Sequence, residues 1–483
     1  MTLAFKNNNW KWVSLAGIIL ASFIAIKLSF IITSKTPKRP NLLLITLDTL
    51  RPDHLNSYGY ERLTSPAITK LVEDSFIMDK AFTVATNSGP SHATLLTGLY
   101  PAQHGLQNNG QKIKATTPTL AEMLRQAGYN TAGFVGYFAL AEESGLNKGF
   151  EEFEINPIAS HDHDHKEPKD DLQGFEAVAD WLKSWAESAE KSPFFIWMHV
   201  QNIHESYDPP APYNSMFEKI SAPQTLAGFE GEFDVRCIND LAKAWRAGIL
   251  PPHFKDEMLA LYDGEIRLVD DQLEKIFNGL KSSGNYDDTI IVLVSDHGEV
   301  LFENYENKFY KQGPGHTGRY SDASLRVPLI LKPAIFHGFK KTSRISQMVS
   351  TVDLVPTLLD LIGLPVTKNL PGASLVPVMR LPAKHSTPKN IFFHEKPYGV
   401  EYTGVRSEQW KFVHKLEKGR ESFLLIDLVG DPKENHFNDS ASQVKAFKSL
   451  LETWKKKNQS IHEEQRMTEE MRQALIEGGY IRK

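Results

Sequence analysis

A serine just ahead of a short predicted helix is the residue of this chain best suited to nucleophilic chemistry. Ser88 opens the stretch Ser88–Gly98, in which Pro90 suits a first helical turn and Gly98 suits a helix end that needs a positive φ. The first N–H groups of a helix have no partner within it and lie at the positive end of the helix dipole, so they attract an anion. An ordinary helix cap has the same pattern, so the serine gains its meaning from polar residues elsewhere in the chain.

Carboxylates and imidazoles follow three predicted strands. Asp48 ends the apolar run 41–47, His204 follows the run 194–200, and Asp296 and His297 follow the run 289–294. Ligands of open α/β sheets lie at the carboxyl ends of the strands, so we expect these side chains to meet at one edge. Two carboxylates and an imidazole suit a divalent cation, which would polarise an ester oxygen beside the serine.

Helical patterns lie between the predicted strands, and this alternation predicts an α/β fold with a large, mostly parallel sheet flanked by helices. Two further strands are expected at Thr131–Val135 and Arg326–Leu331. The expected helices are Ser65–Ser75, Pro118–Ala127, Gly174–Ala189, Glu257–Lys281 and Asp353–Ile362.

Taken together, these residues resemble the motifs of the sulfatase family of the alkaline-phosphatase superfamily. The family's nucleophile motif, Cys/Ser-x-Pro-Ser-Arg and then Leu-Thr-Gly, corresponds to residues 88–92 and 96–98. The resemblance covers most of the chain after residue 40. Its other landmarks are the metal motifs at Leu47–Asp53 and Ser295–Glu299, the active-site histidine at His204, and the stretches Arg326–Pro328, Val352–Leu359, Val405–Phe412 and Ile426–Asn435.

The resemblance implies a domain plan. A sulfatase-like catalytic domain of the alkaline-phosphatase type is expected over residues 41–380. A smaller C-terminal subdomain over 381–460 is expected to hold an antiparallel sheet and a helix. Residues 461–483 are expected to form a charged helix or tail.

The resemblance also implies a metal site. It assigns Asp48, Asp296 and His297 to one divalent ion, which is calcium in the family. Because a histidine ligand beside only two carboxylates is softer than an all-oxygen calcium site, manganese and magnesium stay open.

Five residues are candidates for catalysis. Ser88, or a formylglycine made from it, is the expected nucleophile, and His92 would orient it or contact the anion. His204 would contact the ester oxygen or act as general acid, since its unperturbed pKa lies near working pH. His316 and Arg319 stand where the family has a lysine, and they would hold an anion or protonate a leaving group.

The chain departs from the family pattern in four places. His92 replaces the arginine that belongs to the formylglycine signal, so conversion of Ser88 stays open. Thr49 replaces the second metal carboxylate, the stretch 136–139 lacks the family's Lys-x-His charges, and the stretch 316–319 replaces its lysine.

Two mechanisms compete, and a third function stays open. With formylglycine, the chain would hydrolyse sulfate esters of a small molecule or glycan, and this is the main prediction. With unmodified Ser88, phosphoryl or phosphonyl transfer is favoured, because a phosphoserine is cleared by a second attack on phosphorus whereas a serine sulfate has no easy exit. A non-catalytic anion-binding protein is the third candidate, and retention of all the site residues argues against it.

The N-terminal region predicts a membrane anchor. Residues 13–33 are apolar except for Lys27, and a helix of about 31 Å crosses a bilayer. No Ala-x-Ala site follows, so an uncleaved span is favoured over a cleaved signal peptide. Residues 1–12 would flank the span and residues 34–40 would link it to an exported catalytic domain, which is expected by family analogy.

The composition of the chain limits its possible partners and cross-links. The 483 residues carry a net charge of −5, which gives no argument for nucleic-acid binding. Cys237 is the only cysteine, so no disulfide forms within the chain.

Overall fold

The computed structural model describes most of the chain from residue 39 to residue 458. The described ranges are 39–155, 172–189, 191–301, 303, 314–339, 343–366, 368–381, 390–438 and 440–458. The expected anchor 13–33, its flank 1–12 and the tail 461–483 lie outside these ranges. Within them, no helix combines the length and the apolar character that a membrane span needs.

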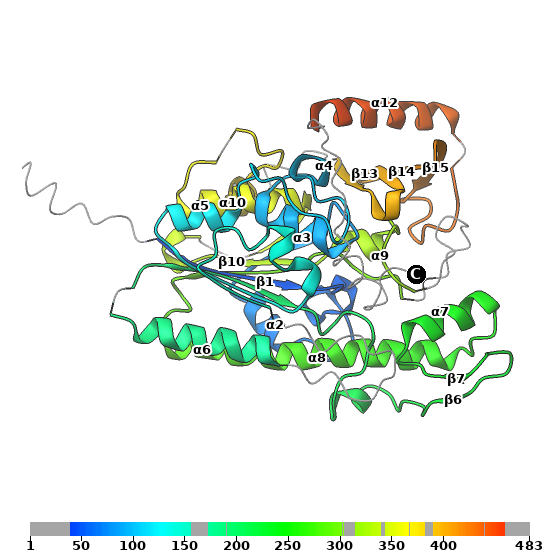
Figure 1. The fold of residues 1–483 in the computed structure, drawn as a ribbon, viewed down its shortest axis with the longest axis horizontal. Coiled ribbons are helices and arrows are strands. Elements are labelled where there is room, and N and C mark those ends of the chain that lie inside the picture. Colours follow the sequence, from blue (N-terminus) through cyan, green and yellow to red (C-terminus); the bar gives the residue numbers. More distant parts are fainter. Residues whose placement is uncertain are drawn as a thin grey trace, which may run out of the picture. The chain divides into compact units, whose positions relative to one another are not determined.

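A nine-stranded sheet runs through the unit that begins at Asn41 (Figure 1). The strands follow one another across the sheet in the order β11-β2-β10-β8-β1-β5-β3-β4, with β9 beside β2. Their bounds are β1 Asn41–Leu47, β2 Phe76–Phe82, β3 Asn130–Val135, β4 Glu152–Ile155, β5 Phe194–Val200, β8 Thr289–Ser295, β9 Arg326–Val327, β10 Leu329–Lys332 and β11 Arg344–Ser350. Only β9 and β10 run against the others, so the prediction of a mostly parallel sheet is confirmed.

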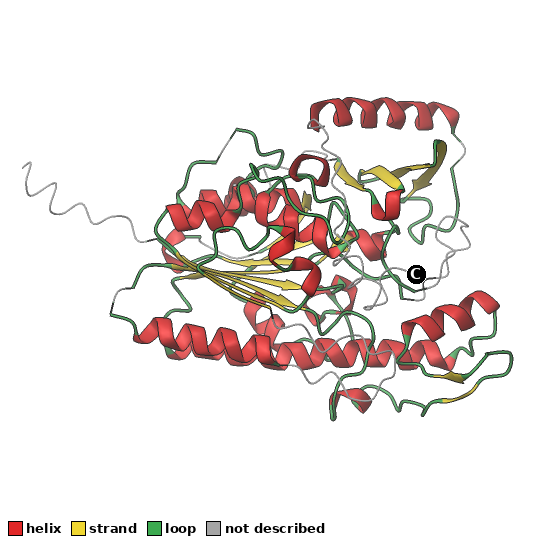
Figure 2. Cartoon of the chain, in the orientation of Figure 1, coloured by secondary structure: helices red, strands yellow, loops and turns green. Residues whose placement is uncertain are grey.

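Helices cover both faces of this sheet, as Figure 2 shows in red. On one face lie α3 (Ser88–Thr97), α5 (Leu120–Gln126) and α10 (Leu354–Ile362); on the other lie α2 (Pro66–Val72), α6 (Gln173–Glu187) and α8 (His253–Ser282). Further helices of the described residues are α4 Pro101–His104, α7 Ile238–Ala247, α9 Asp322–Leu325 and α11 Val376–Arg380. A strand buried on both faces must be apolar throughout, which explains the unbroken apolar run of β1.

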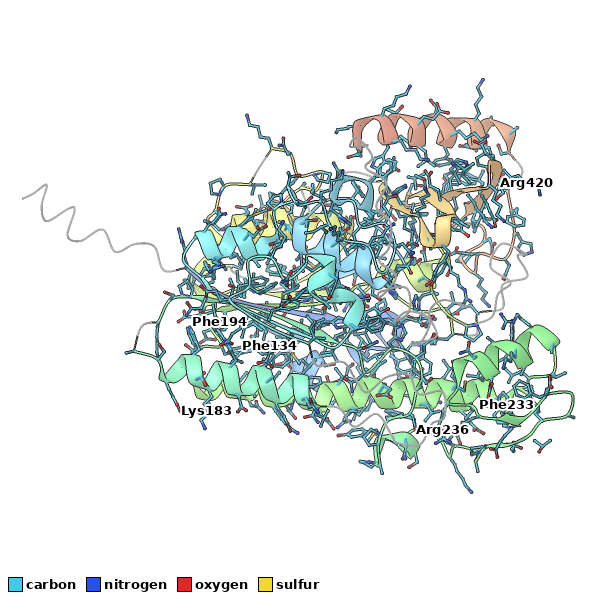
Figure 3. The ribbon with its side chains drawn as sticks, in the orientation of Figure 1. Phe134, Lys183, Phe194, Phe233, Arg236 and Arg420 are labelled. Carbon is cyan, nitrogen blue, oxygen red and sulfur yellow. The ribbon has the colours of Figure 1, made fainter. Side chains whose placement is uncertain are left out.

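The two faces of β1 belong to two separate cores. Leu42 and Leu44 pack with the residues of α3 and α10, whereas Leu43 and Ile45 pack with those of α6 and α8. The second core includes Phe134 and Phe194, which lie beside α6 in Figure 3, and the ring of Trp185 meets Phe194 edge to face.

The expected strand Arg326–Leu331 is wrong as a single element. It is broken at Pro328 into β9 and β10, because proline has no N–H for a sheet hydrogen bond. The strands β2, β4 and β11 were not expected. β2 contains Asp79 and Lys80, and β11 mixes polar with apolar residues, so neither shows a continuous apolar run.

A small C-terminal antiparallel sheet follows, as the sequence predicted. It consists of β12 (Ile391–Glu395), β13 (Glu401–Arg406), β14 (Trp410–Glu417) and β15 (Arg420–Asp427), in that order. The helix α12 (Ala441–Asn458) covers it, and Phe447 stacks on Phe412. The end of β12 also contacts the segment that follows β2, since the His394 N–H donates to the Val84 carbonyl.

A glycine in this small sheet makes room for an aromatic ring. Gly404 pairs with Phe393 across the strands, and a Cβ at position 404 would lie 1.9 Å from that ring, which in turn stacks on Tyr320. We therefore expect Gly404→Ala to displace the ring and to lower the free energy of unfolding by about 1–3 kcal/mol in urea titrations.

A matched glycine provides the control. Gly279 on α8 has no atom within 4 Å of an added Cβ, so Gly279→Ala is expected to leave stability unchanged or to raise it by up to about 1 kcal/mol. A wild-type midpoint for Gly404→Ala would contradict the role of the ring.

Candidate active site

Three potential metal ligands meet at the carboxyl edge of the large sheet. Asp48 follows β1, while Asp296 and His297 follow β8, and the two strands are neighbours with Leu47 opposite Ser295. One ligand atom from each of the three residues lies within 4.8 Å of the others, and all three are fully buried. The sheet register thus produces the convergence that the sequence predicted.

Ser88 lies against this triad. It is the first residue of α3, one position later in the helix than expected, and Asn87 occupies the N-cap. The Ser88 hydroxyl donates to Asp48 Oδ2 at 3.4 Å and lies 3.3 Å from His297 Nε2. The serine oxygen and the three ligand atoms are therefore close enough for one cation to contact them all.

The electrostatics of the triad fit a cation. Burial and the neighbouring Asp48 raise the pKa of Asp296. Burial alone would lower the pKa of His297, but Asp296 and Asp48 raise it more. Among the described residues, Asp296 Oδ2 accepts no hydrogen bond. A divalent cation between the two carboxylates would compensate their charge, so the residues present fit a metal.

Thr49, at the position of the missing family carboxylate, serves the turn after β1. Its φ of 56° is unusual for a β-branched residue and marks local strain. The Thr49 hydroxyl donates to the Ile203 carbonyl at 3.0 Å, while its N–H donates to Asp296 Oδ1 at 3.3 Å. Thr49 thus orients the Asp296 carboxylate, a potential metal ligand, through its backbone N–H.

His92 is fully buried and contacts the backbone of Ser88. Its Nδ1–H donates to the Ser88 carbonyl at 2.8 Å, and its Nε2 accepts from the Thr46 hydroxyl at 3.1 Å. Thr46 in turn accepts from the indole N–H of Trp197 at 3.1 Å. Burial lowers the pKa of His92 to about 3, so the ring is neutral. Both ring nitrogens are used inside the protein, which fits the orienting role better than contact with an anion.

A second buried histidine was missed from the sequence. His199, on β5 opposite Thr46, accepts the Gly136 N–H on Nδ1 at 3.2 Å, which leaves the proton on Nε2. That atom lies 3.5 Å from Asp48 Oδ2, and the ring meets His92 edge to face. The signal was present as a histidine near the end of an otherwise apolar strand.

Two more histidines that the sequence predicted, His204 and His316, lie next to the triad. The His204 ring lies 5.2 Å from that of His316, and the His316 ring lies 4.4 Å from that of His297. The Nδ1–H of His204 donates to the Glu205 carbonyl at 2.9 Å, so Nε2 is the atom that can carry a transferable proton.

Glu299 also lies beside these histidines, a position that the sequence did not predict. Its Oε2 lies 3.0 Å from His316 Nδ1, and burial raises the pKa of Glu299 to about 8. Arg319 is close by, since its charge acts on both residues and its guanidinium lies against Gly315, where a Cβ would come within 2.8 Å. The structure therefore brings His316 and Arg319 to the site.

The C-terminal sheet reaches the turn before Ser88 through Glu395 at the end of β12. This fully buried carboxylate accepts from the Thr86 hydroxyl at 2.6 Å, the Asn87 amide at 2.8 Å and the Tyr320 hydroxyl at 2.6 Å. It thereby ties the turn before the serine to the segment that carries Arg319. No local motif distinguishes Glu395 in the sequence.

Comparisons with known proteins agree with this geometry. Residues 40–364 match the family model described as sulfatase, and residues 319–462 match that of the N-sulphoglucosamine sulphohydrolase C-terminal region. The chain belongs to the sulfatase family.

Several relatives of this sulfatase-family protein are known. An N-acetylglucosamine-6-O-sulfatase from Bacteroides thetaiotaomicron is 24% identical over 86% of this chain and 85% of its own length. An arylsulfatase from Clostridium perfringens is 25% identical over 82% and 89% of the two chains. The phosphonate monoester hydrolase of Agrobacterium radiobacter superposes with a TM-score of 0.69 at 22% identity, covering 87% and 96% of the two chains, which supports the fold.

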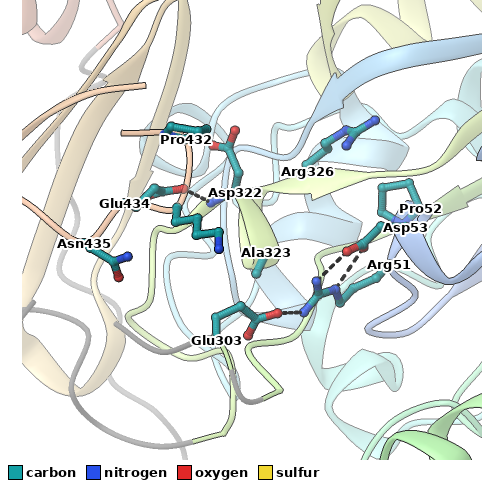
Figure 4. A pocket seen from close by; sticks show the side chains of 11 residues that line it. Arg51, Pro52, Asp53, Glu303, Asp322, Ala323, Arg326, Pro432, Glu434 and Asn435 are labelled. Carbon is teal, nitrogen blue, oxygen red and sulfur yellow. Dashed lines mark hydrogen bonds and ion pairs between the residues drawn. The ribbon is translucent and has the colours of Figure 1, made fainter. Parts of the chain in front are cut away.

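A separate cavity of about 670 Å³ lies between the loop after β1 and the loop after β15 (Figure 4). Arg51 pairs there with Asp53 and Glu303, and Glu434 accepts from the Asp322 N–H. Neither the serine nor the metal triad of this sulfatase-family protein lines the cavity. Most of the charged side chains that line the cavity are paired, which is typical of a structural contact between the loop after β1 and the loop after β15.

Metal binding gives a direct test of the triad. Asp296→Asn removes one of the two carboxylate charges, and we expect metal affinity to fall at least about tenfold, measured by calorimetry and by metal content after dialysis. Asp360→Asn on the exposed side of α10 is the matched control and should bind as wild type. Unchanged affinity of the Asp296 variant would rule out this ligand.

Proposed function

We propose that this protein is a metal-dependent sulfuric ester hydrolase whose nucleophile derives from Ser88. The observation that carries the proposal is the position of the Ser88 oxygen, 3.4 Å from Asp48 and 3.3 Å from His297 at the start of a helix. Membership of the sulfatase family supports sulfate esters as the substrates. The alignments with relatives named as sulfatases extend over most of both chains. The substrate is proposed to be a sulfate ester of a small molecule or glycan.

Asp48, Asp296 and His297 would hold one divalent ion. Such an ion supplies Lewis-acid polarisation of the ester oxygen and lowers the pKa of the nucleophile. Calcium follows from the family, and the imidazole ligand keeps manganese and magnesium as alternatives.

The protein's own groups account for the remaining steps. One hydroxyl of hydrated formylglycine at position 88 would give its proton to Asp48, which accepts from Ser88, and attack sulfur; the S–O bond to the alcohol would break, and protonated His204 would give the leaving oxygen a proton from Nε2. The second hydroxyl would then give its proton to His204 and the C–O bond to sulfate would break, which restores the aldehyde. Water would hydrate the aldehyde again, and Asp48 would release its proton to solvent. His316 and Arg319 would bind the sulfate oxygens, while His92 holds the Ser88 backbone in place.

A second candidate keeps Ser88 as an alcohol and acts on phosphate or phosphonate esters. It is favoured by one observation, the neutral His92 in place of the family arginine, which weakens the signal for formylglycine. Ser88 would take the phosphoryl group, and water would then attack phosphorus and release it.

Mass and activity at position 88 decide between the two. In the first case the peptide containing residue 88 should be lighter by two hydrogens, and 4-nitrophenyl sulfate should be hydrolysed faster than 4-nitrophenyl phosphate. Ser88→Ala should lower kcat at least about 10³-fold, whereas Ser442→Ala on the exposed side of α12 should not.

Other outcomes are equally clear. An unmodified serine in fully active protein that prefers the phosphate ester would select the second candidate. Wild-type rates for Ser88→Ala would refute both.

We further propose that residues 13–33 anchor an exported catalytic domain. The support is the length and apolar character of this segment. The full chain is expected in the membrane pellet after an alkaline carbonate wash, and deletion of residues 1–33 should release it. Release of the full chain by the wash would contradict the anchor.

A further inference from the structure

We propose that Tyr398 is a substrate-binding residue that stacks against a sugar ring forming the alcohol half of the ester. This inference rests on the proposed function and adds the class of alcohol. Four observations carry it: the backbone of Tyr398, its exposure, its attachment beside the nucleophile and the charges around it.

The backbone of Tyr398 is in an unfavourable conformation. In the turn Pro397–Gly399 its φ is 50° and its ψ is 31°, the left-handed region that bulky residues avoid. The side chain is 52% exposed, so burial does not offset this strain. Residues with a strained backbone are found preferentially at active sites and ligand sites.

The turn is fixed beside the nucleophile. Glu395, three residues earlier, binds Thr86 and Asn87, which directly precede Ser88. The Lys396 N–H donates to the Gln107 carbonyl at 2.9 Å, so the backbone that enters the turn is attached to the loop after α4. Tyr398 therefore follows a segment that is attached to the residues directly before Ser88.

Two carboxylates lie near the Tyr398 hydroxyl. Burial raises the pKa of Tyr398 to about 12, helped by the charges of Glu395 and Glu205, the latter being next to His204. Tyr398 is thus near Glu395, which binds the turn before Ser88, and near the loop that carries His204.

These groups favour one kind of alcohol. An aromatic face offers apolar contact to the C–H face of a sugar ring, and a nearby carboxylate such as Glu205 accepts from hydroxyl or amino groups at the ring edge. The negative charges of Glu205 and Glu395 disfavour a ring that carries a carboxylate of its own. The geometry points to a neutral or amino sugar and away from a uronic acid.

Kinetics with paired substrates test the inference. For a galactose or glucosamine monosulfate we expect Tyr398→Ala to raise KM at least about tenfold, and Tyr398→Phe to stay within about threefold of wild type. With methyl sulfate, which has no ring, both variants should match wild type. Phe336→Ala, an exposed aromatic at the opposite edge of the sheet, is the control. Equal KM for Tyr398→Ala and wild type would overturn the proposal, as would a preference for a sulfated uronic acid.

Stability separates a binding role from a structural one. Glycine adopts the left-handed conformation freely, so Tyr398→Gly should melt at the wild-type temperature or about 1–2 °C higher while KM rises as for alanine. A melting temperature several degrees lower would show that the ring supports the fold, and would overturn the proposal.

A binding measurement keeps this test independent of turnover. If wild type hydrolyses neither sulfate nor phosphate esters, the proposed function fails. Ligand-observed NMR with the same monosulfates on Ser88→Ala, with and without Tyr398→Ala, then decides the role of the tyrosine. Binding that is weakened by the second substitution supports it, and binding that is unaffected, or absent from both proteins, overturns it.

Discussion

The structure of this site depends on two buried carboxylates held beside one serine oxygen. Asp48 and Asp296 come from neighbouring parallel strands, so the sheet register alone brings their charges together. Ionised groups buried in protein cost several kcal/mol each unless they are compensated. A divalent cation would remove this cost, and the backbone N–H groups of Thr49 and His297 orient Asp296 toward the position that it would take.

Neutral imidazoles form the layer beneath these charges. Burial lowers the pKa of His92 to about 3 and that of His199 to about 4, so neither adds a positive charge. Each ring is fixed by two polar contacts, His92 between Ser88 and Thr46, and His199 between Gly136 and Asp48. Where the family has an arginine, this protein relies on hydrogen-bond geometry, which positions the serine but supplies no counter-charge.

The small C-terminal sheet contributes a residue, Glu395, that helps to position the site. Glu395 accepts three hydrogen bonds that link the turn before Ser88 with Tyr320, next to Arg319. Tyr320 also stacks on Phe393, for which Gly404 leaves room, and this contact helps to hold Tyr320 against Glu395. Ser88 and Arg319 are therefore positioned by two sheets that fold from distant parts of the chain.

The sequence by itself determined the central strands and the residues directly after them. Asp48, Asp296 and His204 were identifiable because apolar runs mark buried strands and the ends of parallel strands share one edge. The break at Pro328, the strands β2 and β11, and the roles of His199, Glu299 and Glu395 were decided only by the tertiary structure. Their signals are weak locally, because a polar residue in a strand or loop takes its partner from elements far away in sequence. His199 and Glu299 find their partners on the large sheet and its loops, and Glu395 finds them across the two sheets, so only the folded chain specifies which carboxylate meets which donor.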